Sequence, residues 1–194
     1  MEPTPTPPSS TSTYVGPDFP CWTHVLDDGR TVSIRPLRRK DAEADRRFIK
    51  GLSSESRRAR FLGSMVEPSD EEIEALTDID YVNDVALAAT AQAGGREDIV
   101  GVARYATDNA GERCECAVVV ADDWQGHGLA TALMKRLIKI AQERGLRLME
   151  SYDLAGNIGM HDLARSLGFH VRRDPQDVHQ LIYALPLNPE RPAL

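Results

Sequence analysis

The sequence predicts a single α/β (α+β) domain, built on a mixed, mostly antiparallel sheet flanked by helices. Three apolar, β-branched stretches, at residues 85–92, 99–106 and 113–120, follow one another across short polar turns, which is typical of an antiparallel meander. A segment with apolar residues at helical spacing, 129–145, separates the last of these from another apolar run at 146–152, which indicates a parallel β-α-β unit. The predicted order is β-α-α-β-β-β-α-β-α-β-β.

The remaining elements follow from the same two periodicities and from the residues that begin or end each segment. They are a strand at 31–35, helices at 41–50 and 53–61, a short third helix opened by the capping box Ser69-Asp-Glu-Glu72, a helix at 157–168, and a terminal hairpin of residues 169–172 and 178–185.

The domain is expected to span residues 21–186, between a Pro/Ser/Thr-rich, disordered tail at 1–20 and a loose C-terminal end at 187–194. The net charge of −7 disfavours general nucleic-acid binding. No apolar run reaches the ~18 residues of a membrane span, and the N-terminus lacks the basic and apolar parts of a signal peptide. Cys114-x-Cys116 has no second ligand pair. We therefore expect a cytoplasmic protein without a metal.

Charge is distributed unevenly along the chain. Residues 35–60 are rich in Arg and Lys, whereas residues 67–84 hold many Asp and Glu and no basic residue. Two solvated helical faces are the simplest interpretation. Alternatively, the acidic run attracts a cationic amine, or the basic run binds nucleic acid with a steep salt dependence.

The central feature is a glycine-bearing turn between a buried strand and the start of a long helix. It comprises Gln125, Gly126, His127, Gly128, Leu129, Ala130 and Thr131. The glycines let backbone N–H groups approach a ligand, and the helix start adds unpaired N–H groups with a partial positive charge. This predicts a phosphate site. A dinucleotide fingerprint fits only in part, because Thr131 stands where a third Gly or Ala belongs.

Gln125, Gly128 and Ala130 match the Gln/Arg-x-x-Gly-x-Gly/Ala pattern of the acyl-CoA pyrophosphate loop, so the chain resembles the GNAT superfamily of N-acetyltransferases. Residues 101–105, 115–125 and 163–169 are similar to the GNAT domain of bacterial Pat-type protein lysine acetyltransferases. The resemblance covers roughly residues 22–185 and includes the element order. It implies a GNAT-type fold, acetyl-CoA as cosubstrate and a primary amine, such as a protein lysine, as acceptor.

Glu115 is the candidate general base. It begins an otherwise apolar run, where we expect partial burial, and a buried carboxylate is costly unless it is paired or used. The resemblance assigns the base to this position; the alternative is a structural ion pair with Arg104.

The resemblance also implies the cosubstrate contacts. Main-chain groups of Val118 and Val120 would bind the pantetheine arm, residues 125–131 would surround the pyrophosphate, and His127 would add charge or be solvated. Asn157 would contact the arm or only cap a helix. Ala164 occupies the usual position of a tyrosine general acid, so His161 and Tyr152 are the possible substitutes.

Three classes of function therefore stay open. An acetyl-CoA-dependent N-acetyltransferase would act on a protein lysine or on a small-molecule amine. A non-catalytic acyl-CoA sensor would keep the fold without turnover, and a nucleic-acid-binding module would use the basic run. The sequence leaves the oligomeric state open, a homodimer included.

Overall fold

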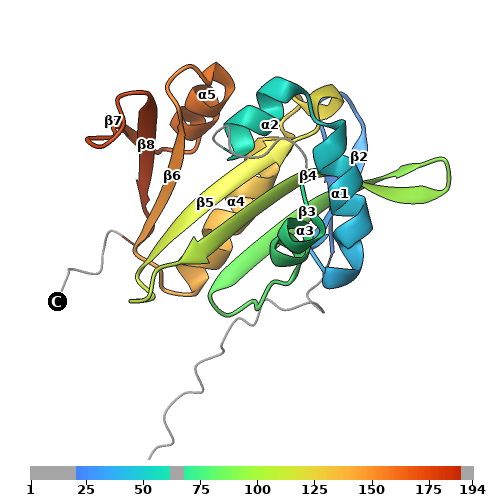
Figure 1. Ribbon diagram of the computed structural model, residues 1–194, viewed down its shortest axis with the longest axis horizontal. Helices are drawn as coiled ribbons and strands as arrows, with labels where there is room; N and C mark the ends of the chain where they lie inside the picture. Colours follow the sequence, from blue (N-terminus) through green and yellow to red (C-terminus); the bar gives the residue numbers. More distant parts are fainter. Residues whose placement is uncertain (1–20, 62–67, 189–194) are drawn as a thin grey trace, which may run out of the picture.

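The computed structural model describes residues 21–61 and 68–188, which form an eight-stranded sheet with helices on both faces (Figure 1). The strand order is β1-β2-β3-β4-β5-β6-β8-β7. The strands are β1 (Trp22–Val25), β2 (Thr31–Pro36), β3 (Asp84–Ala93), β4 (Arg96–Thr107), β5 (Arg113–Val120), β6 (Leu148–Leu154), β7 (His170–Arg173) and β8 (Gln180–Pro186). The helices are α1 (Ala42–Gly51), α2 (Ser54–Phe61), α3 (Asp70–Thr77), α4 (Leu129–Glu143) and α5 (Ile158–Ser166).

The predicted fold class, meander and terminal hairpin are confirmed: β2 to β5 pair antiparallel in succession, and β7 pairs antiparallel with β8. The structure adds β1, which pairs antiparallel with β2 at the edge of the sheet. Its four residues alternate between half-buried and exposed, which is too short a pattern to stand out in the sequence. The short third helix is α3, and both bonds of its predicted capping box are present.

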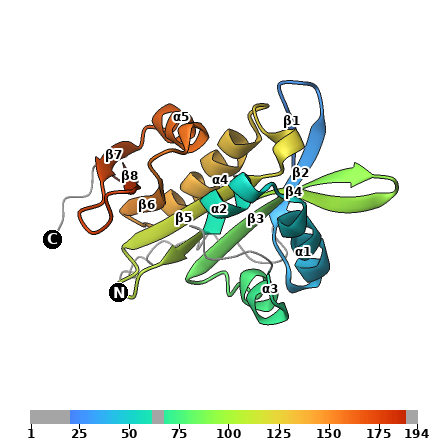
Figure 2. The ribbon, with the colours of Figure 1, turned by 45° about the horizontal axis from the view of Figure 1, so that its top comes forward.

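The helices cover the two faces of the sheet with separate apolar clusters. In Figures 1 and 2, α1, α2 and α3 lie on one face and α4 lies on the other. The α4 stripe is buried as its periodicity predicted, and it includes Leu129, Leu133, Met134, Leu137 and Ile140. Gly101 on β4 lets α4 pack closely against the sheet, because a Cβ at this position would lie only 3.1 Å from Leu133 Cδ1. Met160 and Ala164 of α5 join the same cluster.

The parallel strands β5 and β6 separate soon after they meet. Their register runs only from Arg113↔Leu148 to Glu115↔Glu150, although β5 continues to Val120 and β6 to Leu154. The β-α-β prediction is thus confirmed, but the two strands share a ladder at one end only. Beyond Glu115, the edge of β5 has no neighbouring strand and faces an opening in the sheet.

The basic and acidic runs pair with each other across α1 and α3. Arg46 lies 2.5 Å from Asp70, and Arg39 lies 2.5 Å from Glu74 and 3.3 Å from Asp78. Exposed pairs of this kind contribute about 0–1 kcal/mol each. The pairing nevertheless neutralises part of the acidic run, which weakens the interpretation that this run attracts an amine.

The packed chain continues past the predicted boundary at 186. Leu187 is buried and donates its N–H to Arg147 O, and the Asn188 side chain donates to Leu146 O. The predicted tail at 1–20 and residues 189–194 lie outside the described residues. Within the described ranges, no helix has the length and apolarity to cross a bilayer, and no three His, Cys, Asp or Glu side chains cluster as metal ligands would.

Candidate active site

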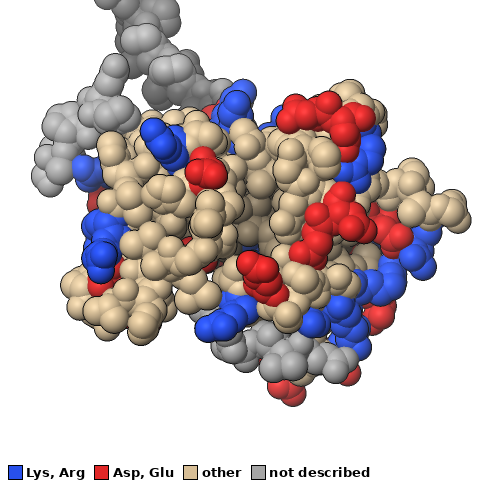
Figure 3. All heavy atoms as spheres, turned by 90° about the horizontal axis from the view of Figure 1, so that it is seen from above, with Lys and Arg blue, Asp and Glu red and all other residues tan. Residues whose placement is uncertain are grey.

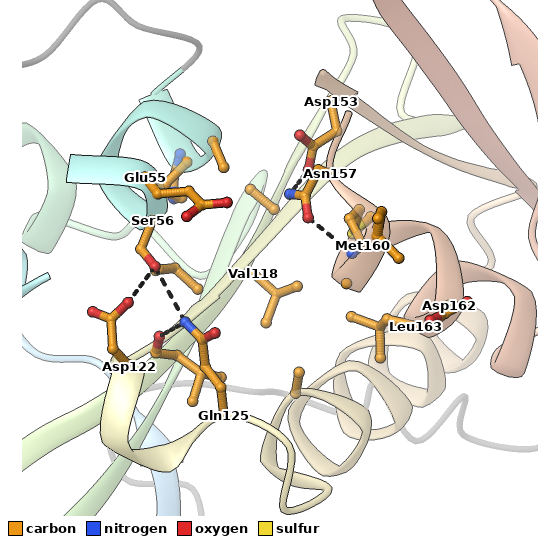
Figure 4. Close-up of a pocket in the computed structure, with 18 of the residues that line it drawn as sticks. Glu55, Ser56, Val118, Asp122, Gln125, Asp153, Asn157, Met160, Asp162 and Leu163 are labelled. Carbon is orange, nitrogen blue, oxygen red and sulfur yellow. Dashed lines mark hydrogen bonds between the residues drawn. The ribbon is translucent and has the colours of Figure 1, made fainter. Parts of the chain in front are cut away.

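A cleft of about 880 Å³ opens where β5 and β6 separate. Seen from above, it is hollowed between the part of the molecule that carries α5 and the part that carries α2 (Figure 3). The close-up in Figure 4 shows Val118 on its floor, Ser56 and Gln125 on one side, and Asn157 and Leu163 on the other. Of the predicted site residues, the cleft is lined by Val118, Val120, Gln125, Gly126, Gly128, Leu129, Ala130, Thr131 and Asn157.

The backbone of β5 presents free polar groups to this cleft. Ala121 N–H donates to Val100 O on β4 at 2.9 Å. Because an extended strand alternates, the N–H and C=O groups of Val118 and Val120 point away from β4, toward the side where β6 has diverged. Because Val120 O accepts from Gln125 Nε2, the groups available to an amide-bearing chain are the N–H and C=O of Val118 and the N–H of Val120.

The glycine turn brings further donors to the cleft. Gly126 and Gly128 have φ values of 76° and 84°, a region that favours glycine. Gly128 is the N-cap of α4, and in the described structure no side chain caps this helix. The first N–H groups of a 15-residue helix therefore face the cleft at Leu129, Ala130 and Thr131. Orphan N–H groups and the helix dipole together form an anion site.

Gln125 is held in place by a hydrogen-bonded cluster that joins the turn to α2 (Figure 4). Its Nε2 donates to Val120 O at 3.0 Å and to Ser56 Oγ at 3.2 Å. Asp122 accepts from Ser56 Oγ at 2.8 Å, from Ser53 N at 2.8 Å and from Ser53 Oγ at 2.7 Å. The glutamine of the motif thus orders the turn and its contact with α2.

His127 is the one residue of the turn that does not line the cleft. Its Nδ1 lies 3.4 Å from Asp28 Oδ2, and its backbone O accepts from Asp27 N. The β1–β2 hairpin therefore packs over the outside of the turn and turns the imidazole away from the cleft. The predicted charge contribution of His127 does not fit this geometry, because Asp28 balances a protonated ring.

Asn157 lines the cleft and also caps α5. Its Oδ1 accepts from Met160 N at 3.1 Å, and its Nδ2 donates to Asp153 Oδ2 at 3.0 Å. Burial raises the pKa of Asp153, although Asn157 and the Leu154 N–H oppose the shift by hydrogen bonding to the carboxylate. The cap is therefore present, and one N–H of the Asn157 amide is left for a ligand.

Glu115 is exposed, so the expectation of partial burial is wrong. It lies two residues before Ala117 on the same face of the sheet, near the start of β5. The predicted alternative, an ion pair with Arg104, is not formed: that guanidinium donates to Leu76 O at 2.9 Å. Glu115 instead marks the last paired position of β5 and β6 and, unlike Ala117 two residues further on, does not line the cleft.

The candidates for a proton donor lie on the β6 and α5 side. Ala164 is 1% exposed in the core and carries no proton. Tyr152 lines the cleft, and burial together with the charges of Glu150 and Glu115 raises its pKa, which keeps the phenol protonated. His161 lies outside the cleft lining. Its ring packs edge-on against the Tyr183 ring, with 6.3 Å between the ring centroids.

No residue of the wall formed by α2 was among the individually predicted site residues. Glu55, Ser56, Arg58 and Arg60 of this helix all line the cleft. Nothing in its local sequence distinguishes it from a solvated basic helix, because the helix has no buried side chain and places itself through polar contacts with Asp122.

Comparison with known proteins assigns this architecture. The sequence profile of the Acetyltransferase (GNAT) family matches residues 52–169, which include α2, the meander, the glycine turn and α5. The chain belongs to this family. The resemblance inferred from Gln125, Gly128 and Ala130 is thereby confirmed, and this GNAT protein is an acetyl-CoA-dependent acetyltransferase.

Two relatives and two solved structures place it further. Acetyltransferase PA5475 of Pseudomonas aeruginosa is 44% identical over 92% of this chain and 96% of that protein. Acetyltransferase Pat of Mycolicibacterium smegmatis is 28% identical over 72% of this chain, which spans only 41% of that protein. The GNAT domain of S. lividans PAT superposes with a TM-score of 0.78 at 28% identity, covering 87% of this chain and 99% of that domain.

A Salmonella typhimurium structure with acetyl-CoA has the same fold, with a TM-score of 0.63 at 20% identity over 84% of this chain and 97% of that one. The cleft of the GNAT protein described here offers the kinds of groups that would bind acetyl-CoA. It combines uncapped helix N–H groups for a diphosphate with an unpaired strand edge for an amide-bearing arm.

Proposed function

We propose that this GNAT acetyltransferase moves the acetyl group of acetyl-CoA directly to a primary amine, with Glu115 as general base. The observation that carries the proposal is the divergence of β5 and β6 immediately after Glu115↔Glu150. Glu115 is then two residues before Ala117, which lines the cleft, and the first residues of α4 line the same cleft.

The amine must lose a proton before it attacks. A lysine-like amine has a pKa near 10.4, so only about one molecule in a few thousand is neutral at pH 7. A carboxylate at the reaction point can remove that proton, and an N–H on the free edge of β5 can stabilise the negative charge that develops on the thioester oxygen. Val118 is the residue whose backbone supports this second role.

Acetyl-CoA supplies the activated acyl group, and the residues of this chain would hold it. The pyrophosphate is assigned to Gln125, Gly126, Gly128, Leu129, Ala130 and Thr131, and the pantetheine arm to Val118, Val120 and Asn157. The protonated Tyr152 is a suitable donor to the departing thiolate. The acceptor is either a protein lysine, on the resemblance to Pat-type domains, or a small-molecule amine.

The test measures thiol release from acetyl-CoA with lysine peptides and small amines, and identifies the product by mass spectrometry. Glu115→Gln should lower kcat/KM by about 10²–10⁴, the usual contribution of a general base, while the Kd for acetyl-CoA stays the same. Glu112→Gln is the matched control, because Glu112 is an exposed acid near the start of β5 that faces Arg147.

Two results would count against the proposal. Full activity of the Glu115→Gln enzyme would remove the base from this position. Tight binding of acetyl-CoA without thiol release for any amine would instead identify a non-catalytic sensor.

A further inference from the structure

Arg60 lines the cleft without an anionic partner. It stands in the last turn of α2, half-buried, and its guanidinium lies 4.9 Å from the centroid of the neighbouring Phe61 ring. Among residues 21–61 and 68–188 it forms no hydrogen bond and no ion pair. Burial, and then the charge of Arg104, lower its pKa to about 10. Removing such a cation from water costs free energy unless a ligand or a neighbouring group supplies acceptors for its N–H groups.

Two other enclosed arginines each have a protein acceptor, although Arg104 Nε has none within the described residues. Arg35 donates to Asp41 at 2.7 Å and to Glu97 at 3.2 Å, and Arg104 donates to Leu76 O at 2.9 Å. Arg60 differs from them in lining the cleft and in having no hydrogen bond to a protein acceptor within the described residues.

Two carboxylates lie near Arg60 without reaching it. The charges of Asp45 and Glu115 both favour its protonated form, yet neither forms an ion pair with the guanidinium. Asp45 is 2% exposed, and its Oδ2 has no hydrogen-bond partner within the described structure. The donors of Arg60 consequently stay available to a ligand, and Arg60 is close enough to the proposed base for the charge of Glu115 to act on its guanidinium.

We propose that Arg60 binds a carboxylate of the acceptor, so that the enzyme acetylates compounds carrying a carboxylate near their amine, as amino acids do. The inference rests on the proposed function, because it places the amine at Glu115. A planar guanidinium can take a carboxylate through two parallel hydrogen bonds, which fixes orientation as well as affinity.

The charges around the cleft favour such a zwitterionic acceptor. Glu55, near the start of α2, lines the same wall as Arg60 and can attract the ammonium group. Three aspartates also line the cleft. Asp162 lies on α5, on the opposite wall (Figure 4), whereas the oxygens of Asp122 and Asp153 are taken up by Ser53, Ser56 and Asn157 and by the Leu154 N–H. Asp122 and Asp153 therefore oppose an incoming carboxylate less than free acids would.

The experiment compares acceptors that differ only in the carboxylate, such as glycine with glycinamide and lysine with lysinamide. The wild-type enzyme should prefer the acids by about tenfold or more in kcat/KM, the range of a charged hydrogen bond. Arg60→Gln should bring that ratio close to one while activity on the amides is largely kept. Arg57→Gln on the same helix, outside the cleft lining, should leave the ratio unchanged.

Arg60→Lys adds a second readout, because a point charge restores attraction without the two-point geometry. It should recover part of the preference for acids. The expected pattern is wild type first, Arg60→Lys next and Arg60→Gln last, with the unfolding midpoint checked for each variant.

Three results would overturn the assignment. Equal use of acids and amides by the wild-type enzyme is one. Another is that Arg60→Gln loses the same fraction of kcat/KM with the acid and with the amide, since Arg60 would then act on the base Glu115 and not on the carboxylate of the acceptor. The third is that Arg60→Gln loses activity with succinyl-CoA but keeps it with acetyl-CoA, since the carboxylate that Arg60 binds would then belong to the acyl group of the donor. Absence of thiol release with every amine would instead count against the proposed function itself.

Discussion

Replacing Asp122 should release α2 from the cleft without unfolding the domain. This helix buries no side chain, so the carboxylate that accepts from Ser53 N, Ser53 Oγ and Ser56 Oγ is its principal attachment at the N-terminal end. Asp122→Asn keeps the shape of the side chain but leaves one oxygen where there were two. At least one donor of α2 then loses its acceptor.

The expected cost follows from the type of bond that is lost. A hydrogen bond to a charged group contributes about 1.5–3 kcal/mol, and removal of an N-terminal cap typically costs about 1 kcal/mol. Because Asp122 is exposed, we take about 1–2 kcal/mol for the opening of α2, which is a factor of about 5–30 in its population. The carboxylate is ionised at neutral pH: partial burial raises the pKa of Asp122, but its hydrogen bonds from Ser53 and Ser56 outweigh this and lower it. Its contribution is therefore lost only as the pH falls below about 4.

Amide hydrogen exchange measures this opening directly. Residues 54–61 should exchange about 5–30 times faster in Asp122→Asn, with α4 and β4 unaffected, and the KM for the acceptor should rise because α2 forms its wall. Asp123→Asn is the matched control, since the described structure gives the Asp123 carboxylate no partner. Unchanged exchange in α2, an equal effect in the control, or acceleration spread over the whole sheet would each refute the reasoning.

Two further predictions concern the turn and the core. Gly128→Ala should weaken acetyl-CoA binding by about tenfold in calorimetry, because a Cβ at φ 84° costs about 1–2 kcal/mol and would lie 3.1 Å from Asp27 Oδ2. Gly126→Ala, which meets no atom within 4 Å, should cost less, and equal losses would contradict the clash. Burial raises the pKa of Asp45 to about 6 against the opposing charge of two arginines, so the stability it contributes is lost as pH rises through 6. Asp45→Asn should therefore gain about 3 kcal/mol relative to wild type in urea unfolding between pH 4 and pH 8, and a constant difference would refute this.

Local patterns in the sequence were enough to identify most elements and the glycine turn before α4. The α4 stripe from Leu129 to Ile140 and the meander ended within a few residues of their predicted limits, because side-chain periodicity reflects burial within one segment. Gly126 and Gly128 were recognisable for the same local reason, since a left-handed backbone favours glycine at both positions.

Other features of the site depend on segments that are distant in the sequence. The turn around His127 is covered by Asp28 from the β1–β2 hairpin, and the cleft wall comes from α2, fastened by Asp122 some 66 residues further along the chain. No periodicity within these segments specifies such contacts.

The sequence alone determined the order of elements from β2 onward, the glycine turn before α4 and the carboxylate near the start of β5. Only the tertiary structure decided where β5 and β6 part, which side chains face the resulting cleft, and that Arg60 reaches it without a partner. Side-chain periodicity is a property of one segment, whereas register and facing surfaces arise from the packing of segments against each other.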